Sequence, residues 1–253
     1  MTSPPPIRAL ATAGALSLTA VALIGPASAG TSVAPMVGVP AVGACSTMTP
    51  AQAAAPADRS TVVECSLKHT AQVAGVVKLP VTLQWDTATD HALYRVVARR
   101  CLPKVAAMLG RSTRTRDSSA YDVLWFRPTK AQITQGARWL SCSIELRQGR
   151  SLAHLPTSTT PFLSAGALPD KVARCLTKRA LTTRCSAAHR WRATGSFTVS
   201  GSYPGQKKLN GRADKKCRTR VKAGLAYRWT YQDKVTWNVG GDHVIVCYSP
   251  GTS

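Results

Sequence analysis

Two histidines with matching surroundings are the first candidates for chemistry in this chain. His69 follows Cys65 by four residues, and His189 follows Cys185 by four residues; a serine comes directly after each cysteine. A histidine acts as a general base when a nucleophile or a carboxylate lies within hydrogen-bonding reach. The chain has no Gly-x-Ser-x-Gly nucleophile elbow and few acidic residues. We therefore expect no catalytic residue and interpret both histidines as structural groups that bond to the backbone beside a disulfide.

The spacing of Cys65 and His69 also resembles that of a pair of metal ligands. The sequence contains no Cys-x-x-Cys pair, which structural zinc sites commonly use. It also lacks a glycine-rich phosphate-binding loop and a dinucleotide fingerprint. The sequence predicts neither a metal nor a cofactor.

The histidine motif belongs to a longer repeat. The stretch from Cys65 to Gly75 returns as the stretch from Cys185 to Gly195, with cysteine, serine, histidine and glycine at the same spacing. The other cysteines keep one order around each copy, so the pattern predicts a duplicated module with four cysteines. The cysteines are Cys45, Cys65, Cys101 and Cys142 in the first half and Cys175, Cys185, Cys217 and Cys247 in the second.

The beginning of the chain has the pattern of a secretory signal peptide. Arg8 precedes an apolar run from Ala9 to Ile24, and the small triplet Ala27-Ser28-Ala29 follows. The run is shorter than the roughly 20 residues that a membrane-spanning helix needs. We expect cleavage after Ala29 and a secreted protein, extracytoplasmic or associated with the cell wall. The stretch before Cys45 resembles a lipoprotein cleavage box but lies far beyond the apolar run, and the sequence leaves lipidation of Cys45 open.

Export makes disulfides the expected state of the cysteines. If every bridge stays within its half and both halves agree, three pairing patterns are open. We favour the first cysteine with the second and the third with the fourth: Cys45–Cys65, Cys101–Cys142, Cys175–Cys185 and Cys217–Cys247.

Hydrophobic periodicity predicts an α+β fold made of two tandem disulfide-bonded repeat modules. Each module is expected to have a small sheet, one main helix and one short helix. In the first half the main helix spans residues 89–110, with a kink or break at Pro103. In the second half a helix is expected to start at Asn210 or Asp214. The predicted organisation is a signal peptide (1–29), a flexible tether (30–43), a first module (44–149), a linker (150–170) and a second module (171–253).

Positive charge is the strongest feature of the composition. The chain has 33 Lys and Arg against 11 Asp and Glu, a formal net charge of +22. Residues 171–253 carry a net +14 and residues 45–150 a net +8, so the second half is the more basic. Such a field attracts polyanions. The residues expected to bind them are Lys207, Lys208, Lys215, Lys216, Arg218, Arg220, Lys222, Arg190 and Arg192.

These motifs together resemble the septum formation domain of actinobacterial secreted and membrane-anchored proteins. The first half has Gly43-Ala44-Cys45, Cys65 with His69 and Gly75, Cys101, and Pro128-Thr129 leading through Gly136 to Cys142. The second half has Cys175, Cys185 with His189 and Gly195, Cys217, and Gly241 leading to Cys247, without the Pro-Thr pair. Gln72 and Arg192 stand where the family often has an acidic residue. The resemblance implies two tandem copies and a link to cell division or the envelope, without an implied activity.

The sequence therefore predicts an exported, non-catalytic envelope protein. Its expected partner is an anionic cell-wall polymer or another envelope protein, bound through the basic surface. The positive charge of the protein is also compatible with contact with a membrane surface. An envelope hydrolase and an extracellular nucleic-acid-binding protein are the alternatives, and nucleic acid is the less favoured partner. The sequence does not specify an oligomeric state.

Overall fold

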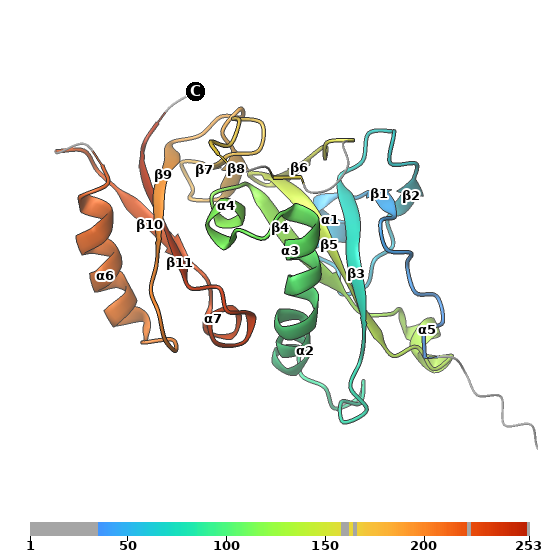
Figure 1. Ribbon diagram of the computed structural model, residues 1–253. Coiled ribbons are helices and arrows are strands. Elements are labelled where there is room, and N and C mark those ends of the chain that lie inside the picture. Colours follow the sequence, from blue (N-terminus) through green and yellow to red (C-terminus); the bar gives the residue numbers. More distant parts are fainter. Residues whose placement is uncertain (1–34, 158–161, 164–165, 222–223, 252–253) are drawn as a thin grey trace, which may run out of the picture. The chain divides into compact units, whose positions relative to one another are not determined.

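One antiparallel sheet runs through both halves of the computed structural model (Figure 1). The structure describes residues 35–157, 162–163, 166–221 and 224–251, all within the unit Val33–Ser253. The signal peptide expected over residues 1–29 lies outside the described residues. The strands found in the described residues are β1 (Cys45–Thr47), β2 (Thr61–Val63), β3 (Ala71–Lys78), β4 (Tyr121–Phe126), β5 (Trp139–Gln148), β6 (Ser151–Ala153), β7 (Arg174–Leu176), β8 (Thr182–Arg184), β9 (Trp191–Thr198), β10 (Arg228–Tyr231) and β11 (Val244–Pro250).

The order of strands is the same in each half. In the first half it is β2-β1-β3-β5-β4, and in the second half it is β8-β7-β9-β11-β10. Gln148 at the end of β5 pairs with Thr183 of β8 and joins the two sets, while β6 pairs with the end of β5. The prediction of a mixed α+β fold is confirmed. The expectation that each half has its own small sheet is wrong, because the pairing of β5 with β8 joins the strands of both halves in one sheet.

Each half also has a β-bulge at the same place in its motif. In the first half Val73 lies opposite Ser143 and Gly75 lies opposite Cys142, so that one extra residue stands before the glycine. In the second half Gly195 lies opposite Cys247, again after one extra residue, Thr194. A bulge bends its strand and increases the local twist. The glycine of each motif is thus placed opposite the fourth cysteine of its half.

The main helix of the first half consists of three segments on one face of the sheet, α2 (Asp90–Val96), the π-helical η1 (Val97–Cys101) and α3 (Leu102–Leu109). Thr89 caps the start through a bond from the backbone N–H of Ala92. Pro103 has no N–H to donate into the helix, and the chain widens into η1 just before it. The expected kink or break at Pro103 takes the form of this π-helical turn, and the helix continues through the proline to Leu109. Leu93, Val97 and Cys101 are buried against the sheet.

In the second half one helix, α6 (Gln206–Arg218), covers β9, β10 and β11 (Figure 1). Leu209, Ala213 and Cys217 form its buried stripe at four-residue spacing and contact Phe197 and Ile245 of the sheet. The helix begins several residues earlier than the expected Asn210 or Asp214. Its first turn is polar, so apolar periodicity did not reveal it.

The remaining helices are short. One of them follows the main helix, where Ser112 accepts a hydrogen bond from the N–H of Thr115 and caps a single turn. These helices are α1 (Pro50–Ala53), α4 (Thr113–Asp117), α5 (Lys130–Thr134) and α7 (Lys234–Gly240).

Helix α7 of the second half packs against α2 and η1 of the first. The hydroxyl of Tyr94 bonds to Thr236 and donates to the carboxylate of Asp233. Gly240 lies so close to the first half that a Cβ there would be 2.8 Å from Cδ1 of Leu102. This close approach joins the helical layers of the two halves, as β5 and β8 join their strands.

The four disulfides have the predicted pairing, Cys45–Cys65, Cys101–Cys142, Cys175–Cys185 and Cys217–Cys247, and no cysteine of the described chain is free. One bridge of each half ties the main helix to the strand that ends that half, and the other closes the loop before the histidine. Each such bridge contributes roughly 2–4 kcal/mol of stability.

Two expected connections are more ordered than the sequence suggested. Within the expected tether, residues 35–43 are bonded to the sheet: Trp139 Nε1 donates to the carbonyl of Val37, and the N–H of Gly43 donates to Val73. Within the expected linker, residues 151–153 form β6, and the N–H of Leu155 donates to the carbonyl of His69. The described part of the tether is therefore docked and not flexible, because its backbone groups find partners on the first half.

In both halves a basic side chain lies directly over the motif glycine. This basic residue is the third residue after the third cysteine of its half. A Cβ on Gly75 would lie 2.2 Å from Cδ of Lys104, and a Cβ on Gly195 would lie 3.3 Å from Cδ of Arg220. We expect Gly75→Ala to destabilise the fold by about 1–2 kcal/mol and Gly195→Ala by less than about 1 kcal/mol. Chemical denaturation measures both values.

Lys104→Ala provides the control for this prediction. Removal of the long side chain makes room for the new methyl group, so Gly75→Ala should cost much less in a Lys104→Ala background. An unchanged cost in that background would show that the glycine is needed for another reason.

Candidate functional site

The two motif histidines have the same local geometry in both halves. Nδ1 of His69 donates to the carbonyl of Leu67 at 2.8 Å, and Nδ1 of His189 donates to the carbonyl of Ala187 at 2.9 Å. His69 is fully buried, whereas His189 is half-buried. Nε2 of His69 has no hydrogen-bond partner in the described part of the chain. This geometry supports the structural interpretation of both residues, since each histidine closes a turn beside a disulfide.

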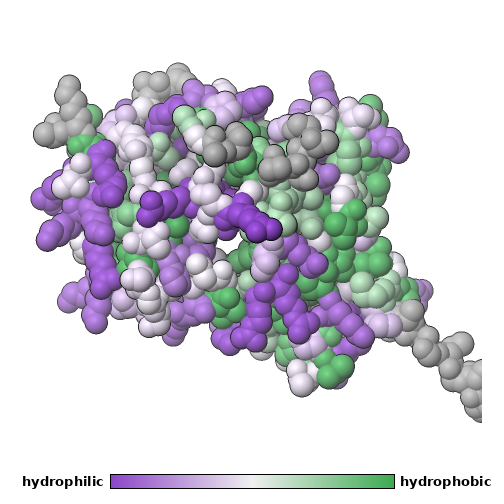
Figure 2. All heavy atoms as spheres, in the orientation of Figure 1, coloured by the Kyte–Doolittle hydropathy of each residue, from purple (hydrophilic) through white to green (hydrophobic). Residues whose placement is uncertain are grey.

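The predicted basic residues of the second half gather on α6. The exposed side of this helix has six cations and one acid, Asp214, and Figure 2 shows hydrophilic atoms covering it at the left of the view. Arg212 belongs to this set and was missing from the prediction, although it lies between the two lysine pairs in the sequence. The cations are Lys207, Lys208, Arg212, Lys215, Lys216 and Arg218. We call this set, together with Arg220, the α6 basic surface; Lys222 lies outside the described residues.

Aromatic rings and one carboxylate hold part of the α6 basic surface in place. Arg218 pairs with Asp214 at 3.0 Å and donates to the hydroxyl of Tyr227. Nζ of Lys216 lies 4.9 Å from the ring centre of Phe197, and the guanidinium of Arg220 lies 5.1 Å from the same ring. These cation–π contacts fix the cations without neutralising them.

The other cations of α6 are unpaired. Within the described ranges, no carboxylate pairs with Lys207, Lys208, Arg212 or Lys215. Like charges at three- and four-residue spacing on a helix repel one another. A bound polyanion would relieve that repulsion, so these side chains are available to an anionic ligand.

Arg190 and Arg192 are not part of the α6 basic surface by contact. Arg192 forms an ion pair with Asp170, which lowers the pKa of that exposed carboxyl through a hydrogen bond and its charge. Arg190 is exposed at the start of β9, where its N–H donates to the carbonyl of Leu176. The structure therefore gathers most of the predicted binding residues on one helix and leaves these two on a separate strand end.

A buried polar cluster lies where the two halves meet, and the sequence repeat did not indicate it. The carboxyl of Asp117, at the end of α4, is within hydrogen-bonding reach of Asp242, which follows α7. Burial and the neighbouring Asp242 carboxylate raise the pKa of Asp117 well above its usual value, although Arg174 and Arg116 partly oppose the shift. The environment of Asp117 thus disfavours its charged form.

The space beside this carboxyl pair is small. It is a cavity of about 180 Å³, lined by residues of both halves that include Arg116, Arg174 and Tyr121. Burial also raises the pKa of the Tyr121 hydroxyl, which has no partner in the described residues. Ligand pockets usually measure about 300–1,000 Å³. The cluster is chemically able to exchange protons, but its cavity has no room for a polymer, and we assign it to the junction between the halves.

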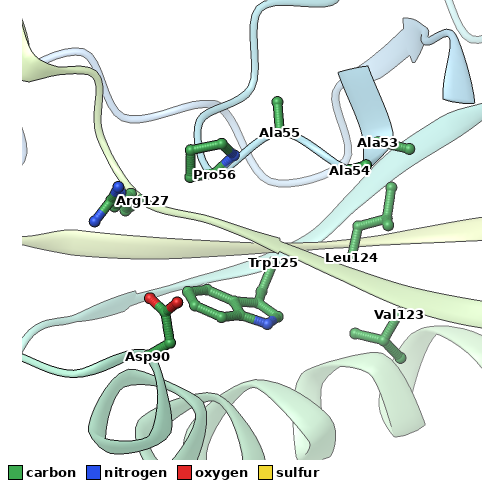
Figure 3. Close-up of a pocket in the computed structure, with 9 residues that line it drawn as sticks. All are labelled: Ala53, Ala54, Ala55, Pro56, Asp90, Val123, Leu124, Trp125 and Arg127. Atoms are coloured by element: carbon green, nitrogen blue, oxygen red, sulfur yellow. The ribbon is translucent and has the colours of Figure 1, made fainter. Parts of the chain in front are cut away.

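A groove of about 530 Å³ lies along the edge strand β4. Figure 3 shows Trp125 and Val123 directed to one side of the strand and Leu124 to the other. Asp90 and Arg127 are its only charged lining residues, and their charges balance. This groove therefore adds nothing to the attraction of polyanions.

Glu145 of β5 is a second buried carboxyl that the sequence did not single out. Its side chain lies on the face of the sheet opposite the helices, since Cys142, an odd number of residues away, bonds to Cys101 of the helix layer. Oε1 accepts a bond from Arg147 at 2.8 Å, while Oε2 is buried without a partner in the part of the chain that the structure describes. Burial raises the pKa of Glu145 to about 7, even though Arg147 works against this.

The described residues contain no group of three or more His, Cys, Asp or Glu side chains placed to hold a metal ion. They also contain no helix that is long and apolar enough to cross a membrane. Four disulfides are typical of proteins outside the cytoplasm.

The fold is a disulfide-bonded unit of mixed helices and strands whose second half carries a basic helix. The family described as "Septum formation" matches residues 42–247, and the chain belongs to this family. This is a single match that spans both halves. No curated protein and no solved structure matches the chain. Membership connects the protein with septum formation and hence with the cell envelope.

Removal of the Glu145 carboxyl should change how stability depends on pH. The pKa of this group rises from 4.5 when unfolded to about 7 when folded. The folded state therefore holds the proton more tightly, and stability is lost as the pH rises from 4.5 to 7, by an amount on the order of 3 kcal/mol.

We expect Glu145→Gln to flatten this part of the pH profile, because the amide cannot ionise and its oxygen can still accept from Arg147. Thermal melts between pH 4 and pH 8 measure the effect. Asp122→Asn, at a half-exposed carboxylate opposite Glu145, is the control and should leave most of the slope in place. An unchanged slope in Glu145→Gln would contradict the assignment.

The histidine geometry predicts unequal effects of substitution. His69→Ala leaves the Leu67 carbonyl without its buried donor, which costs about 1–3 kcal/mol. His189→Ala should cost less than about 1 kcal/mol, since water can reach a half-buried position. Urea denaturation measures both, and polymer binding by the folded variants should be unchanged. Loss of binding with full stability would instead make the histidines part of a site.

Proposed function

We propose that this protein is an exported, non-catalytic envelope protein, linked to septum formation, that binds an anionic wall polymer through the α6 basic surface. The observation that carries the proposal is the set of six exposed cations on one helix, of which only Arg218 has a carboxylate partner in the described residues. A regular row of cations at helical spacing suits a ligand with repeating negative charges. Wall polymers with phosphate or carboxylate repeats have this chemistry.

Export and the extracytoplasmic location are part of this proposal. They are supported by the signal-peptide pattern of residues 1–29 and by the four disulfides. The resemblance of the motifs points to an actinobacterial envelope as the setting. A protein partner with an acidic surface and contact with an anionic membrane surface are compatible with the same helix.

We also propose that the two halves arose by duplication of one four-cysteine module. Four features support this origin: the shared strand order, the bulge before each motif glycine, the matching histidine bonds and the cation that crosses each glycine. On this interpretation the modules are residues 44–149 and 171–253. The basic surface is a specialisation of the second module, since the main helix of the first is interrupted by η1 and carries fewer cations.

A hydrolase is the second candidate, and one observation favours it. Asp117 and Asp242 come from different halves and lie close together, and burial raises the pKa of Asp117. Against it stands the cavity of about 180 Å³, which cannot admit a glycan or peptide chain without rearrangement. We therefore rank polymer binding above catalysis.

The proposal predicts which charges matter for binding. In the exported protein, Gln substitutions at Lys207, Lys208, Arg212 and Lys215 should weaken binding to purified acidic wall polymer by about tenfold or more at low salt. They should also reduce the slope of log affinity against log salt concentration, because fewer counterions are released. Equilibrium titration at several salt concentrations measures both quantities.

A matched control removes four exposed cations from the first half. Gln substitutions at Arg59, Lys68, Lys130 and Arg150 change the net charge equally and leave α6 intact. Binding by this variant should fall only slightly. Equal loss in both variants would show that total charge and not the α6 basic surface attracts the polymer, and preference for DNA over wall polymer at equal salt would favour the nucleic-acid alternative.

A further inference from the structure

A second basic site lies where the main helix of the first half meets the end of α7, and the sequence did not indicate it. It is a groove of about 310 Å³ between the loop after β3, the helix segments α2 and η1, and the end of α7. Three of the nine residues that line it are arginines, and none is acidic. Its volume lies at the lower end of the range for small-molecule sites, which is about 300–1,000 Å³.

The helix geometry explains how three arginines reach one groove. Arg95 and Arg99 are four residues apart, so they lie on the same side of the helix. Arg99 and Arg100 belong to η1, the widened turn that precedes Pro103, in which the N–H of Leu102 bonds to the carbonyl of Val97. Short π-helical turns are frequent at functional sites.

Most of the hydrogen-bond donors of these arginines are unused. Nη1 of Arg100 makes a long bond of 3.4 Å to the carbonyl of Lys78. In the described chain, the side chains of Arg95 and Arg99 have no hydrogen bond and no ion pair with another residue. Asp233, the carboxylate directly before α7, already accepts hydrogen bonds from the hydroxyls of Thr236 and Tyr94. Three guanidinium groups around one hollow without a carboxylate favour a bound anion.

Guanidinium groups bind phosphate particularly well. The planar fork of donors matches two phosphate oxygens at once, and charge-assisted bonds of this kind are about twice as strong as neutral ones. Carboxylates match the same fork, but three arginines offer more hydrogen-bond donors than one carboxylate can accept. A phosphate group, with more oxygens and more charge, fits the groove better.

Apart from Thr82, the rest of the groove is apolar. Leu83, Val96 and Val239 line it together with Pro80, and the adjacent Val81 is 76% exposed. A purely inorganic anion would leave this surface in contact with water. Burial of hydrocarbon against it is favourable by about 25 cal/mol per Å².

We propose that this groove binds a phosphate group carried on a hydrocarbon chain. The arginines hold the phosphate, and the apolar residues receive the first carbons of the chain. The ligand chemistry is shared by anionic phospholipids and by free alkyl or isoprenyl phosphates. The site is separate from the α6 basic surface, so experiments on polymer binding neither support nor contradict it.

The probes that test this site are hexyl phosphate, inorganic phosphate and hexanol, titrated calorimetrically into the exported protein. Hexyl phosphate should bind more tightly than inorganic phosphate, and hexanol should not bind. The double variant Arg95→Gln, Arg99→Gln should lose binding of hexyl phosphate by about tenfold or more. The control Arg59→Gln, Arg150→Gln removes the same charge from exposed positions elsewhere and should retain binding.

A third variant separates the apolar contribution from the ionic one. Val239→Thr keeps the shape of the side chain but adds a hydroxyl, so it should weaken hexyl phosphate and leave inorganic phosphate unchanged. Thermal melts confirm that each variant is folded, and wall-polymer binding by Arg95→Gln, Arg99→Gln should be retained.

Vesicles with and without phosphatidic acid distinguish the two sources of ligand. Binding to phosphatidic acid vesicles that is abolished in Arg95→Gln, Arg99→Gln identifies a membrane lipid, whereas binding of hexyl phosphate alone identifies a free phosphate. Equal affinity for hexyl phosphate and inorganic phosphate would overturn the assignment of the apolar surface. Equal losses in the arginine variant and its control, or absence of binding by every probe, would overturn the site.

Discussion

The rest of this structure depends on one arrangement, the disulfide that ties the main helix of each half to the strand opposite the motif glycine. Cys101–Cys142 and Cys217–Cys247 hold the helices close to the sheet, and the glycine opposite each strand cysteine leaves room for the next turn of the chain. A cation then crosses the glycine with its hydrocarbon stem and extends its charge to solvent. In the second half this geometry directs one face of α6 into the core and the other, with its cations, outward.

The junction between the halves is built differently, from polar groups and close backbone contacts. Gly240 allows α7 to approach η1, and burial together with the nearby Asp242 raises the pKa of Asp117, so that its charged form is disfavoured. Because β5 also pairs with β8, the halves form a single sheet, which agrees with a family match that covers both of them. The Arg95, Arg99 and Arg100 groove lies at this junction, with Val239 contributed by the second half.

Much of the fold was predictable because its signals are local. The strands β3, β5 and β9 are rich in β-branched or alternating apolar residues, and the repeated cysteine order left only three pairing patterns, of which the favoured one is present. The early start of α6 was missed since its first turn contains Gln206, Lys207 and Lys208, which carry no apolar periodicity. The docking of residues 35–43 was also missed, because small uncharged residues are equally common in free segments and in segments that bond to a sheet through their backbone.

The sequence by itself determined the repeated order of the cysteines, the disturbance of the main helix next to Pro103 and the concentration of positive charge in the second half, since each depends on spacing or composition along the chain. Only the tertiary structure decided which charges share a surface. It separated Arg192, paired with Asp170, from α6, and it brought together Asp117 and Asp242 from different halves. The physical reason is that burial and charge pairing depend on distances in space, and residues far apart in a chain acquire those distances only when the sheet and its helices pack.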